Sequence, residues 1–274
     1  MSWVAPMTMS RVKIGAVIVA AVVAVGMGVS CSPPAPQPLV APLASTGPTA
    51  TVSDVGTESD AIGRGPVAVI PPLGTNGFAL VPTGPALDLL DRLAVDDTPS
   101  PVPYSRARFG PGWADPDGNG CTGREEAIID WATPDSVRQG PGCRIEAVTL
   151  TSLYDGIEIV AATSGDVAQL IQVDHIVSVK DAFRQLCCVT GPDAQRLRVL
   201  FYNDPENLLP ISSAANQHKS DYLFGDKRFA YVSDDAACFV ADHTVRVKTM
   251  YGLSVASSEL AALRERLANC EPAS

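Results

Sequence analysis

Hydrophobic and polar positions change their spacing several times along residues 86–270, and each spacing predicts a kind of element. Apolar residues at helical intervals predict helices over residues 85–93, 124–131 and 180–187. Short apolar runs, most of them alternating, predict strands over residues 144–150, 156–162, 166–173, 207–211 and 245–250. Helices and strands are interleaved without an internal repeat, so the pattern predicts a mixed α+β domain of modest size.

Serine residues mark the starts of two more predicted helices. Ser212 or Ser213 precedes a helical pattern that ends at residue 219, and Ser257 or Ser258 precedes residues 259–268. A hydroxyl at such a position accepts a hydrogen bond from an otherwise unpaired amide of the first turn. We therefore expect both helices to be capped by a serine side chain.

The N-terminus has the pattern of an export signal. Arg11 and Lys13 precede an apolar run over residues 14–29, and small residues lead to Cys31. Cysteine directly after small residues resembles a bacterial lipoprotein cleavage site, so residues 1–31 are predicted to be a signal segment with a lipid on Cys31 that binds the membrane. Plain secretion and an uncleaved N-terminal anchor are the alternatives.

Composition divides the rest of the chain into a linker and a domain. Residues 32–85 are rich in Pro, Ala, Ser and Thr and have little periodicity, which predicts a disordered linker. Residues 86–274 then form the predicted domain. The protein is therefore expected to be secreted, or lipid-anchored at the cell envelope outside the cytoplasm.

The cysteines support an extracytoplasmic location. Without Cys31, six of the seven cysteines remain, and an even number in an exported protein predicts disulfides. Proximity in sequence favours the pairs Cys121–Cys143 and Cys238–Cys270. Cys187 and Cys188 are then left to each other or to exchange.

The net charge limits the kinds of nucleic-acid binding that can be expected. The 274-residue chain carries a formal charge of −10 at pH 7. Proteins that coat DNA usually present a basic face, because neutralising phosphates releases counterions. The composition argues against tight nonspecific DNA binding, but one metal ion and a few local cations can still hold a single phosphate.

Three polar blocks carry the candidate chemistry. Asp174 and His175 follow an apolar run, while Asn207 and Asn216 lie in the next two blocks. Neutral imidazole titrates near working pH and can deprotonate a water molecule, so His175 is the candidate general base. Asp174 and Asn216 offer carboxylate and amide oxygens for Mg²⁺ or Mn²⁺, and Asn207 is the candidate to orient the His175 ring.

These blocks resemble a known family. Residues 173–177 (VDHIV), 203–209 (NDPENLL) and 216–221 (NQHKSD) look like a ββα-metal (HNH) finger. The resemblance is to the secreted bacterial HNH endonuclease-like family related to the C-terminal domain of GmrSD-type restriction enzymes. It extends from about residue 86 to 270 and includes Tyr104-Ser105-Arg106 and residues 113–121 (WADPDGNGC). The implied fold is an HNH finger embedded in a disulfide-braced α+β domain.

The resemblance also implies roles for individual residues. His175 would be the general base, Asp174 and Asn216 the metal ligands, and Asn207 the residue that supports the histidine. Arg198 matches a family arginine expected to meet phosphate. The implied activity is metal-dependent hydrolysis of phosphodiester bonds in a nucleic acid substrate, DNA first and RNA as a further candidate.

A second cation signal lies upstream. Asp115, Asp117, Asn119 and Glu126 have the spacing of the oxygen ligands of an EF-hand loop and predict a Ca²⁺ site. The alternative is a turn whose Asp and Asn side chains bond the local backbone. Two other functions stay open beside the nuclease: a non-catalytic envelope lipoprotein that uses this fold to bind a partner, and a Ca²⁺-stabilised adhesion module.

Overall fold

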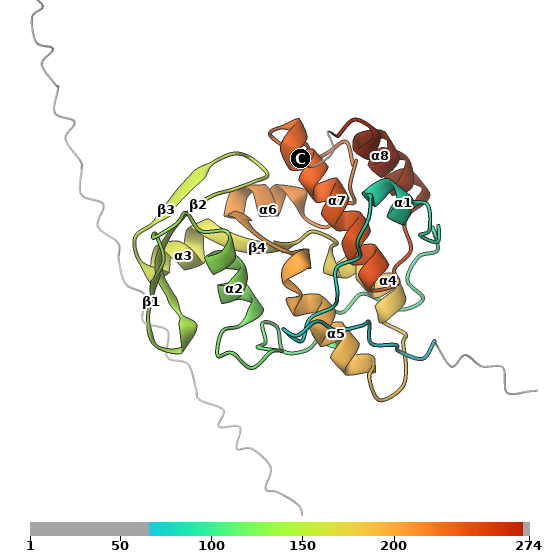
Figure 1. Ribbon diagram of the computed structural model, residues 1–274, viewed down its shortest axis with the longest axis horizontal. Coiled ribbons are helices and arrows are strands. Elements are labelled where there is room, and N and C mark those ends of the chain that lie inside the picture. The colour runs from blue at the N-terminus through green and yellow to red at the C-terminus, as the bar shows by residue number, and fades with distance from the viewer. Residues whose placement is uncertain (1–65, 271–274) are drawn as a thin grey trace, which may run out of the picture. The chain divides into compact units, whose positions relative to one another are not determined.

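The computed structural model describes residues 66–270, which belong to one compact unit (Figure 1). The predicted signal segment with Cys31, and residues 32–65 of the predicted linker, lie outside the described residues. The strands are β1 (Arg138–Gln139), β2 (Ile145–Thr151), β3 (Glu158–Ala161), β4 (Ile171–His175) and β5 (Leu208–Ser212). The helices are α1 (Ala86–Leu90), α2 (Gly123–Asp130), α3 (Ser164–Leu170), α4 (Val179–Leu186), α5 (Ala194–Asn203), α6 (Ser213–Lys219), α7 (Asp234–Met250) and α8 (Ser257–Ala268). Short 3₁₀ turns are η1 (Arg106–Phe109), η2 (Pro141–Cys143) and η3 (Pro205–Asn207).

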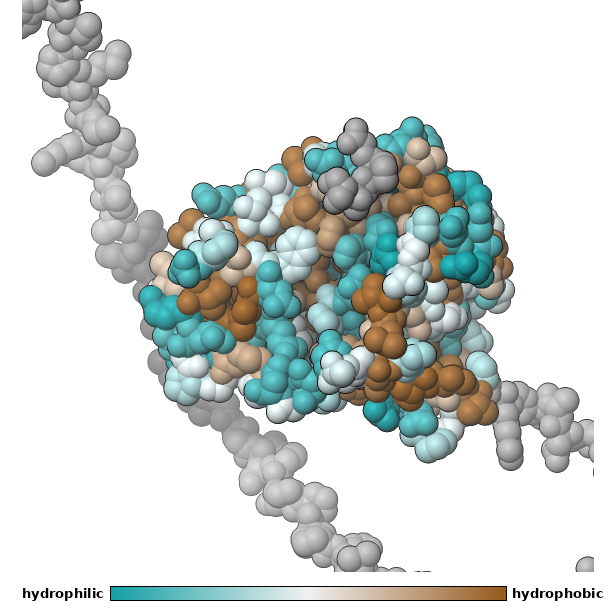
Figure 2. All heavy atoms as spheres, viewed as in Figure 1, coloured by the Kyte–Doolittle hydropathy of each residue, from teal (hydrophilic) through white to brown (hydrophobic). Residues whose placement is uncertain are grey.

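Residues 66–85, the end of the predicted linker, run along the folded domain. Val67 forms a parallel bridge with Thr190, and Phe78 and Ala79 are buried. Other apolar side chains of the segment are exposed, and Figure 2 shows an apolar area at the lower right, where the segment runs in Figure 1. Contacts to the domain therefore extend upstream of residue 86.

A three-stranded antiparallel sheet forms one side of the domain, at the left of Figure 1. Its order is β1-β2-β3, and in β3 the buried side chains of Ile159 and Ala161 alternate with exposed ones. The buried face packs against an apolar cluster that includes Ile128 of α2 and Val167 of α3. The strands predicted over 144–150 and 156–162 are confirmed.

A helix occupies the first part of the run that predicted a strand over 166–173. Thr163 and Asp166 form a capping box, in which the threonine hydroxyl accepts from the Asp166 amide at 3.2 Å. The Asp166 carboxylate accepts in return from the Thr163 amide at 3.0 Å. The cap stabilises α3, so β4 begins only at Ile171 and the prediction was wrong for the preceding residues.

The strands β4 and β5 form a separate antiparallel pair, and α6 follows β5 directly. Asp174 pairs with Leu209 and His175 with Leu208, so the two candidate residues stand at the end of the pair. Ser212 caps α6 by accepting from the Ala215 amide at 3.0 Å, as predicted. The helices α4 and α5 lie between the two strands in sequence.

The sequence prediction was most wrong for the helical side of the domain, at the right of Figure 1. The run predicted as a strand over 245–250 is the end of the 17-residue helix α7. Val245 packs in the apolar cluster of α1 and α8, whereas Val247 packs in the cluster of α4 and α5. Apolar residues two positions apart are both buried because two clusters cover different sides of one helix.

Two further helices differ from expectation. No element was predicted for α5, although Leu197, Leu200 and Phe201 are buried at helical spacing. The helix α8 is present but has Ala256 at its N-cap with no side-chain hydrogen bond, so the predicted serine cap is wrong. Ser257 instead bonds the carboxylate of Asp97 through its backbone amide (2.8 Å) and its hydroxyl.

A buried cluster of charges connects three helices. The ammonium of Lys248 on α7 lies 2.6 Å from Asp181 on α4 and 2.7 Å from Glu259 on α8. All three side chains are buried, and Lys248 also donates to the Ser254 carbonyl. Burial of the ammonium is tolerated because each of its donors has an acceptor.

Three disulfides brace the domain. The pairs are Cys121–Cys143, Cys187–Cys188 and Cys238–Cys270, which are the two that proximity favoured and the adjacent pair that it left. The last of them connects the start of α7 to the end of α8. Among residues 66–270, no helix combines the length and the apolar character needed to cross a membrane.

Candidate functional site

A cleft of about 610 Å³ lies at the end of β4 and gathers residues from four parts of the chain. Asp174 and His175 come from β4, Asn216 comes from α6, and Tyr104 and Arg106 come from the segment at η1. The start of α4 and the turn after α6 complete the wall. The structure therefore brings the predicted base and both predicted metal ligands to one cavity.

The imidazole of His175 is held in one orientation. Its Nε2 lies 2.8 Å from the carbonyl oxygen of Tyr202, and its ring stacks on Trp113 at 5.6 Å between centroids and 8° between planes. A carbonyl can only accept, so Nε2 carries the proton and Nδ1 is the unprotonated nitrogen. The carbonyl thus selects the tautomer that leaves Nδ1 able to accept a proton.

The Nδ1 atom is open although the residue is only 4% exposed. Nδ1 makes no hydrogen bond within residues 66–270, and the single fully buried side-chain nitrogen or oxygen without a hydrogen bond among those residues is Nη2 of Arg184, which lies 3.0 Å from Asp181 in an ion pair. Nδ1 is therefore not fully buried. Because His175 lines the cleft, this edge of the ring is the one a ligand in the cleft can reach.

Burial lowers the pKa of His175 to about 3, and the nearby charges of Arg106 and Lys219 add to the effect. The ring is therefore neutral at every ordinary working pH. A neutral base is the form that general-base chemistry needs, but a pKa this low makes it a weak base in the free protein. An anionic ligand in the cleft would raise this pKa by favouring the charged form.

The shift predicts a specific dependence of stability on pH. Because the folded-state pKa lies below the ordinary value of 6.5, the unfolded chain takes up this proton first as pH falls. The free energy of unfolding should therefore decrease below pH 6.5, by about 1.4 kcal/mol per pH unit. Chemical denaturation of the wild type and of His175→Asn between pH 8 and 5 measures the difference.

The comparison with His175→Asn is needed because another group works in the opposite direction. Burial raises the pKa of Asp204 to about 6, so the folded state gains a proton first and is stabilised as pH falls from about 6 toward 3.8. This contribution is common to both proteins and cancels in the difference. A difference that stays constant between pH 8 and 5 would contradict the buried, neutral ring.

One carboxylate oxygen of Asp174 is hydrogen-bonded and the other is not. Its Oδ2 accepts from the hydroxyl of Tyr154 at 2.7 Å and lies 2.7 Å from the ammonium of Lys219. Its Oδ1 makes no hydrogen bond or ion pair to any described residue and is not fully buried. Lys219 is itself buried and also donates to the His175 carbonyl at 3.0 Å, which ties α6 to the end of β4.

Asn216 also has a free oxygen. Its Nδ2 donates to Oε1 of Gln172 at 2.7 Å, and Gln172 lies on the same face of β4 as Asp174 because strand side chains alternate. The amide oxygen has no partner among residues 66–270. One carboxylate oxygen and one amide oxygen fit a hard divalent cation that keeps several waters and gains further oxygens from a phosphate.

This donor set is small. No group of three or more His, Cys, Asp or Glu side chains that would hold a metal occurs among the described residues. A Mg²⁺ ion characteristically uses one or two protein carboxylates together with waters and substrate oxygens, so a short set of protein donors suits it. The same set would hold Zn²⁺ poorly, since structural zinc sites use four nitrogen or sulfur ligands.

The structure gives Asn207 a different partner from the one predicted. Its side chain does not bond the His175 ring, which the Tyr202 carbonyl holds instead. The Asn207 amide accepts from the Val177 amide at 2.8 Å and donates to the Val177 carbonyl at 3.4 Å. Asn207 therefore supports the backbone just after β4 and positions His175 through the chain.

Arg198 lies outside the cleft. Its guanidinium donates to the carbonyls of Arg108 and Leu186 and to the side chain of Gln195. Arg106 is the arginine that lines the cleft, and it donates to the Tyr202 hydroxyl at 2.8 and 3.0 Å. The resemblance had included Arg106 in its opening segment without a role, and only the fold brings it beside the base.

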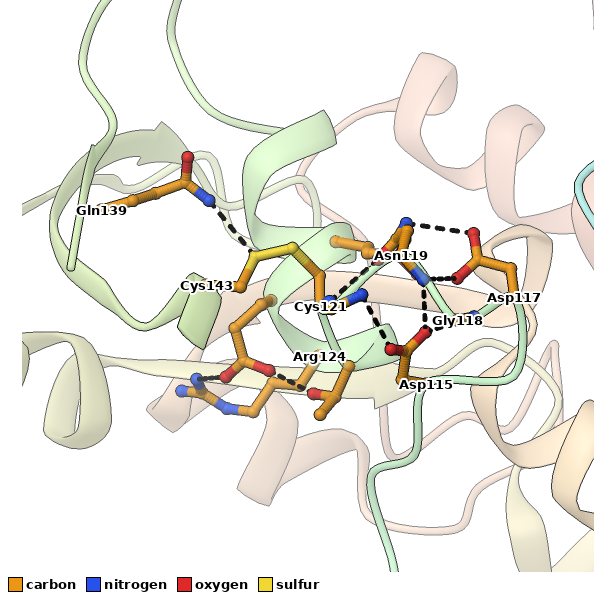
Figure 3. The surroundings of a disulfide bond; sticks show 12 residues. Asp115, Asp117, Gly118, Asn119, Cys121, Arg124, Gln139 and Cys143 are labelled. Carbon is orange, nitrogen blue, oxygen red and sulfur yellow. Dashed lines mark hydrogen bonds and ion pairs between the residues drawn. A yellow bond between two sulfur atoms is a disulfide. The ribbon is translucent and has the colours of Figure 1, made fainter. Parts of the chain in front are cut away.

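The predicted Ca²⁺ loop forms a compact turn next to the Cys121–Cys143 disulfide (Figure 3). The Asp115 carboxylate accepts from the amides of Gly118, Asn119 and Gly120. Asn119 in turn donates to Asp117 and Glu126. These are the local bonds of the alternative turn interpretation, and Ca²⁺ binding stays a prediction.

The part of the chain that holds this site is similar to a known family. Residues 137–266 match the family model of the C-terminal domain of GmrSD restriction endonucleases, which covers β4, β5 and α6 with Asp174, His175 and Asn216. The chain is therefore related to the C-terminal domain of these nucleases, as the sequence resemblance predicted.

One curated relative is also similar. It is an uncharacterized secreted protein of Arthroderma benhamiae (strain ATCC MYA-4681 / CBS 112371), 29% identical over 201 residues, which are 70% of this chain and 91% of the relative. No solved structure matches the chain. The family match thus indicates a nuclease-related function at a coarse level.

Proposed function

We propose that the protein is an exported, metal-dependent endonuclease of the HNH type that hydrolyses phosphodiester bonds in DNA, with RNA as a further substrate. The observation that carries the proposal is that one cleft is lined by His175, whose Nδ1 makes no hydrogen bond, and by Asp174 and Asn216, each of which has an oxygen without a hydrogen bond among the described residues. The family match supports a nuclease. The order of β4, β5 and α6 supports a ββα-metal finger with α4 and α5 inserted between its strands.

Export is supported by three observations. The N-terminal sequence has a basic start, an apolar run and small residues before Cys31. The relative from Arthroderma benhamiae carries the name of a secreted protein. Three disulfides suit an oxidising compartment outside the cytoplasm. A lipid on Cys31 would then keep the enzyme at the membrane.

The residues of the cleft have different roles in the proposed hydrolysis. His175 takes a proton from the attacking water at Nδ1, while Nε2–H keeps its bond to the Tyr202 carbonyl and stabilises the charged ring. Arg106 brings positive charge to the cleft, where the phosphate arrives. A divalent cation, Mg²⁺ or Mn²⁺, would be held by Asp174 and Asn216 and would supply Lewis-acid stabilisation of phosphate oxygens.

Lys219 has a positioning role. Its ammonium forms an ion pair with Asp174 and a hydrogen bond with the His175 carbonyl. One side chain therefore positions both the base and the carboxylate. Burial of this ion pair fixes its geometry, because the two charges lose their hydration and must stay paired. The site is thus built on packed elements, which favours precise placement of reacting groups.

A plasmid-nicking assay tests the proposed function directly. We expect the purified protein to convert supercoiled DNA to the nicked form with Mg²⁺ or Mn²⁺ and to lose this activity in EDTA, because a divalent cation would supply the positive charge that stabilises the phosphate oxygens. The same assay with a single-stranded RNA tests the second substrate. No cleavage of either nucleic acid with either cation would contradict the proposal.

A further inference from the structure

An apolar hollow of about 400 Å³ adjoins the cleft. The two cavities share Tyr104, Lys180 and Asp221, so these residues form the rim between them. Beyond the rim, the surface of the hollow is mainly apolar; its wall is formed by Pro99, Phe183 and Leu223 together with Ser100, Asp181 and Arg184. The volume lies within the range of about 300–1,000 Å³ that is usual for small-molecule sites.

Tyr104 presents an aromatic ring to this space. It is 42% exposed, and its ring meets that of the buried Phe183 at 81° with 5.2 Å between centroids. Pro101 and Pro103 precede it and restrict the backbone. Phe183 in turn packs on Phe109 in the core. An exposed ring with rigid support is the arrangement on which single-stranded nucleic acids stack their bases.

The cationic side chains near the rim suit a phosphate in the cleft, next to a base in the apolar hollow. Lys180 pairs with Asp221, but the lysine side chain is 60% exposed and the aspartate 35%. Such an exposed pair contributes little stability, so the ammonium is free to turn toward a phosphate. Arg106 supplies a second cation on the cleft side. The cation-lined cleft and the apolar hollow thus adjoin each other, as a phosphate and its neighbouring base do in a nucleic-acid strand.

We propose that this hollow binds one nucleobase of the strand whose phosphate occupies the cleft, with Tyr104 as the stacking residue. The proposal rests on the proposed nuclease function and narrows its substrate class to nucleic acid with an unpaired base at the cleavage site. A base inside a duplex is stacked and paired, and it reaches such a hollow only after unstacking. Single strands, loops and frayed ends meet this condition directly.

The inference also accounts for the acidic balance of the chain. A net charge of −10 leaves little capacity for binding by counterion release. Stacking of a base on an aromatic ring is a sequence-tolerant source of affinity that does not require a broad basic face. Binding should therefore depend less on salt than binding by a basic nuclease of equal affinity.

The test measures binding without cleavage. Fluorescence anisotropy with a labelled single-stranded oligonucleotide and with its duplex, in EDTA and on the His175→Ala background, compares Tyr104, Tyr104→Phe and Tyr104→Ala. We expect tighter binding of the single strand, a loss of about 5- to 100-fold in Tyr104→Ala and less than about a twofold change in Tyr104→Phe, which keeps the ring. Duplex binding should be nearly equal in all three proteins.

A second readout follows the base itself. An oligonucleotide with 2-aminopurine should change its fluorescence on binding the protein with Tyr104, and the change should be lost in Tyr104→Ala, whose folding is checked by its melting temperature. Equal single-strand affinity and equal fluorescence in both proteins would overturn the subsite while metal-dependent cleavage stands. If the protein neither binds nor cleaves any nucleic acid, the proposed function itself fails.

Discussion

Replacing His175 by alanine should lower the rate of phosphodiester cleavage by about 10²–10⁴-fold, the usual contribution of a general base. The reason is that Nδ1 of this ring is the open, unprotonated nitrogen in the cleft, while Nε2 is committed to the Tyr202 carbonyl. The rate of plasmid nicking at saturating Mg²⁺, measured under single-turnover conditions, gives the effect directly.

A matched control separates chemistry from the loss of any histidine. His218 is an exposed residue on the same helix as Asn216, and its ring lies against Phe229 instead of the cleft. His218→Ala should nick at nearly the wild-type rate. Equal rates for wild type and His175→Ala would rule out the proposed base and would favour the alternative of a non-catalytic envelope lipoprotein that uses this fold to bind a partner.

A structural defect in His175→Ala can also be distinguished from a chemical one. The ring stacks on Trp113 and is almost fully buried, so the variant contains a cavity and should be less stable than the wild type. Added imidazole can enter such a cavity and restore part of the base function. Partial rescue of nicking by imidazole is expected, and a purely structural loss would not respond to it in this way.

Asp174→Asn should have the second largest effect, on both activity and stability. The variant keeps the shape of the side chain but loses its negative charge, so the Mg²⁺ concentration for half-maximal nicking should rise by at least about 10- to 100-fold. It also leaves the buried ammonium of Lys219 without its counter-ion. The free energy of unfolding should fall by about 3–5 kcal/mol, measured by urea denaturation.

A double variant separates these two effects. In Asp174→Asn/Lys219→Met the unpaired ammonium is replaced by an apolar side chain of similar length, so most of the lost stability should return. The catalytic defect should remain, because the carboxylate that would hold the cation is still absent. Recovery of activity together with stability would show that Asp174 acts only through its ion pair, and its proposed role as a metal ligand would be lost.

Local patterns predicted some elements well and others poorly, and the difference has a physical cause. The strands β2 and β5 and the helices α2 and α6 were predicted within a few residues, because short apolar runs, helical spacing and, for α6, the Ser212 cap are local features of the sequence. The end of α7 was predicted as a strand because Val245 and Val247, two positions apart, pack in apolar clusters on two sides of the helix. Sequence periodicity assumes one buried face and fails where there are two.

The candidate site was likewise predicted in part from the sequence. Residue types identified His175, Asp174 and Asn216 as candidates, and the structure gathers them in one cleft. The partner of the His175 ring was predicted to be Asn207 but is the Tyr202 carbonyl, 27 positions away in sequence. A backbone carbonyl has no signature in the side-chain sequence, so no reading of residue types identifies it as the group that selects the tautomer.

The sequence alone determined the inventory of this protein: an export-type N-terminus, six cysteines in the domain, and the carboxylate, amide and imidazole that suit metal-assisted hydrolysis. Tertiary structure alone decided how these groups are used. It placed Arg106 in the cleft and Arg198 outside it, and it bonded Lys219 to the end of β4 across 44 positions of the chain. Such contacts depend on how α6 packs against β4, and packing between distant segments leaves no local period in the sequence.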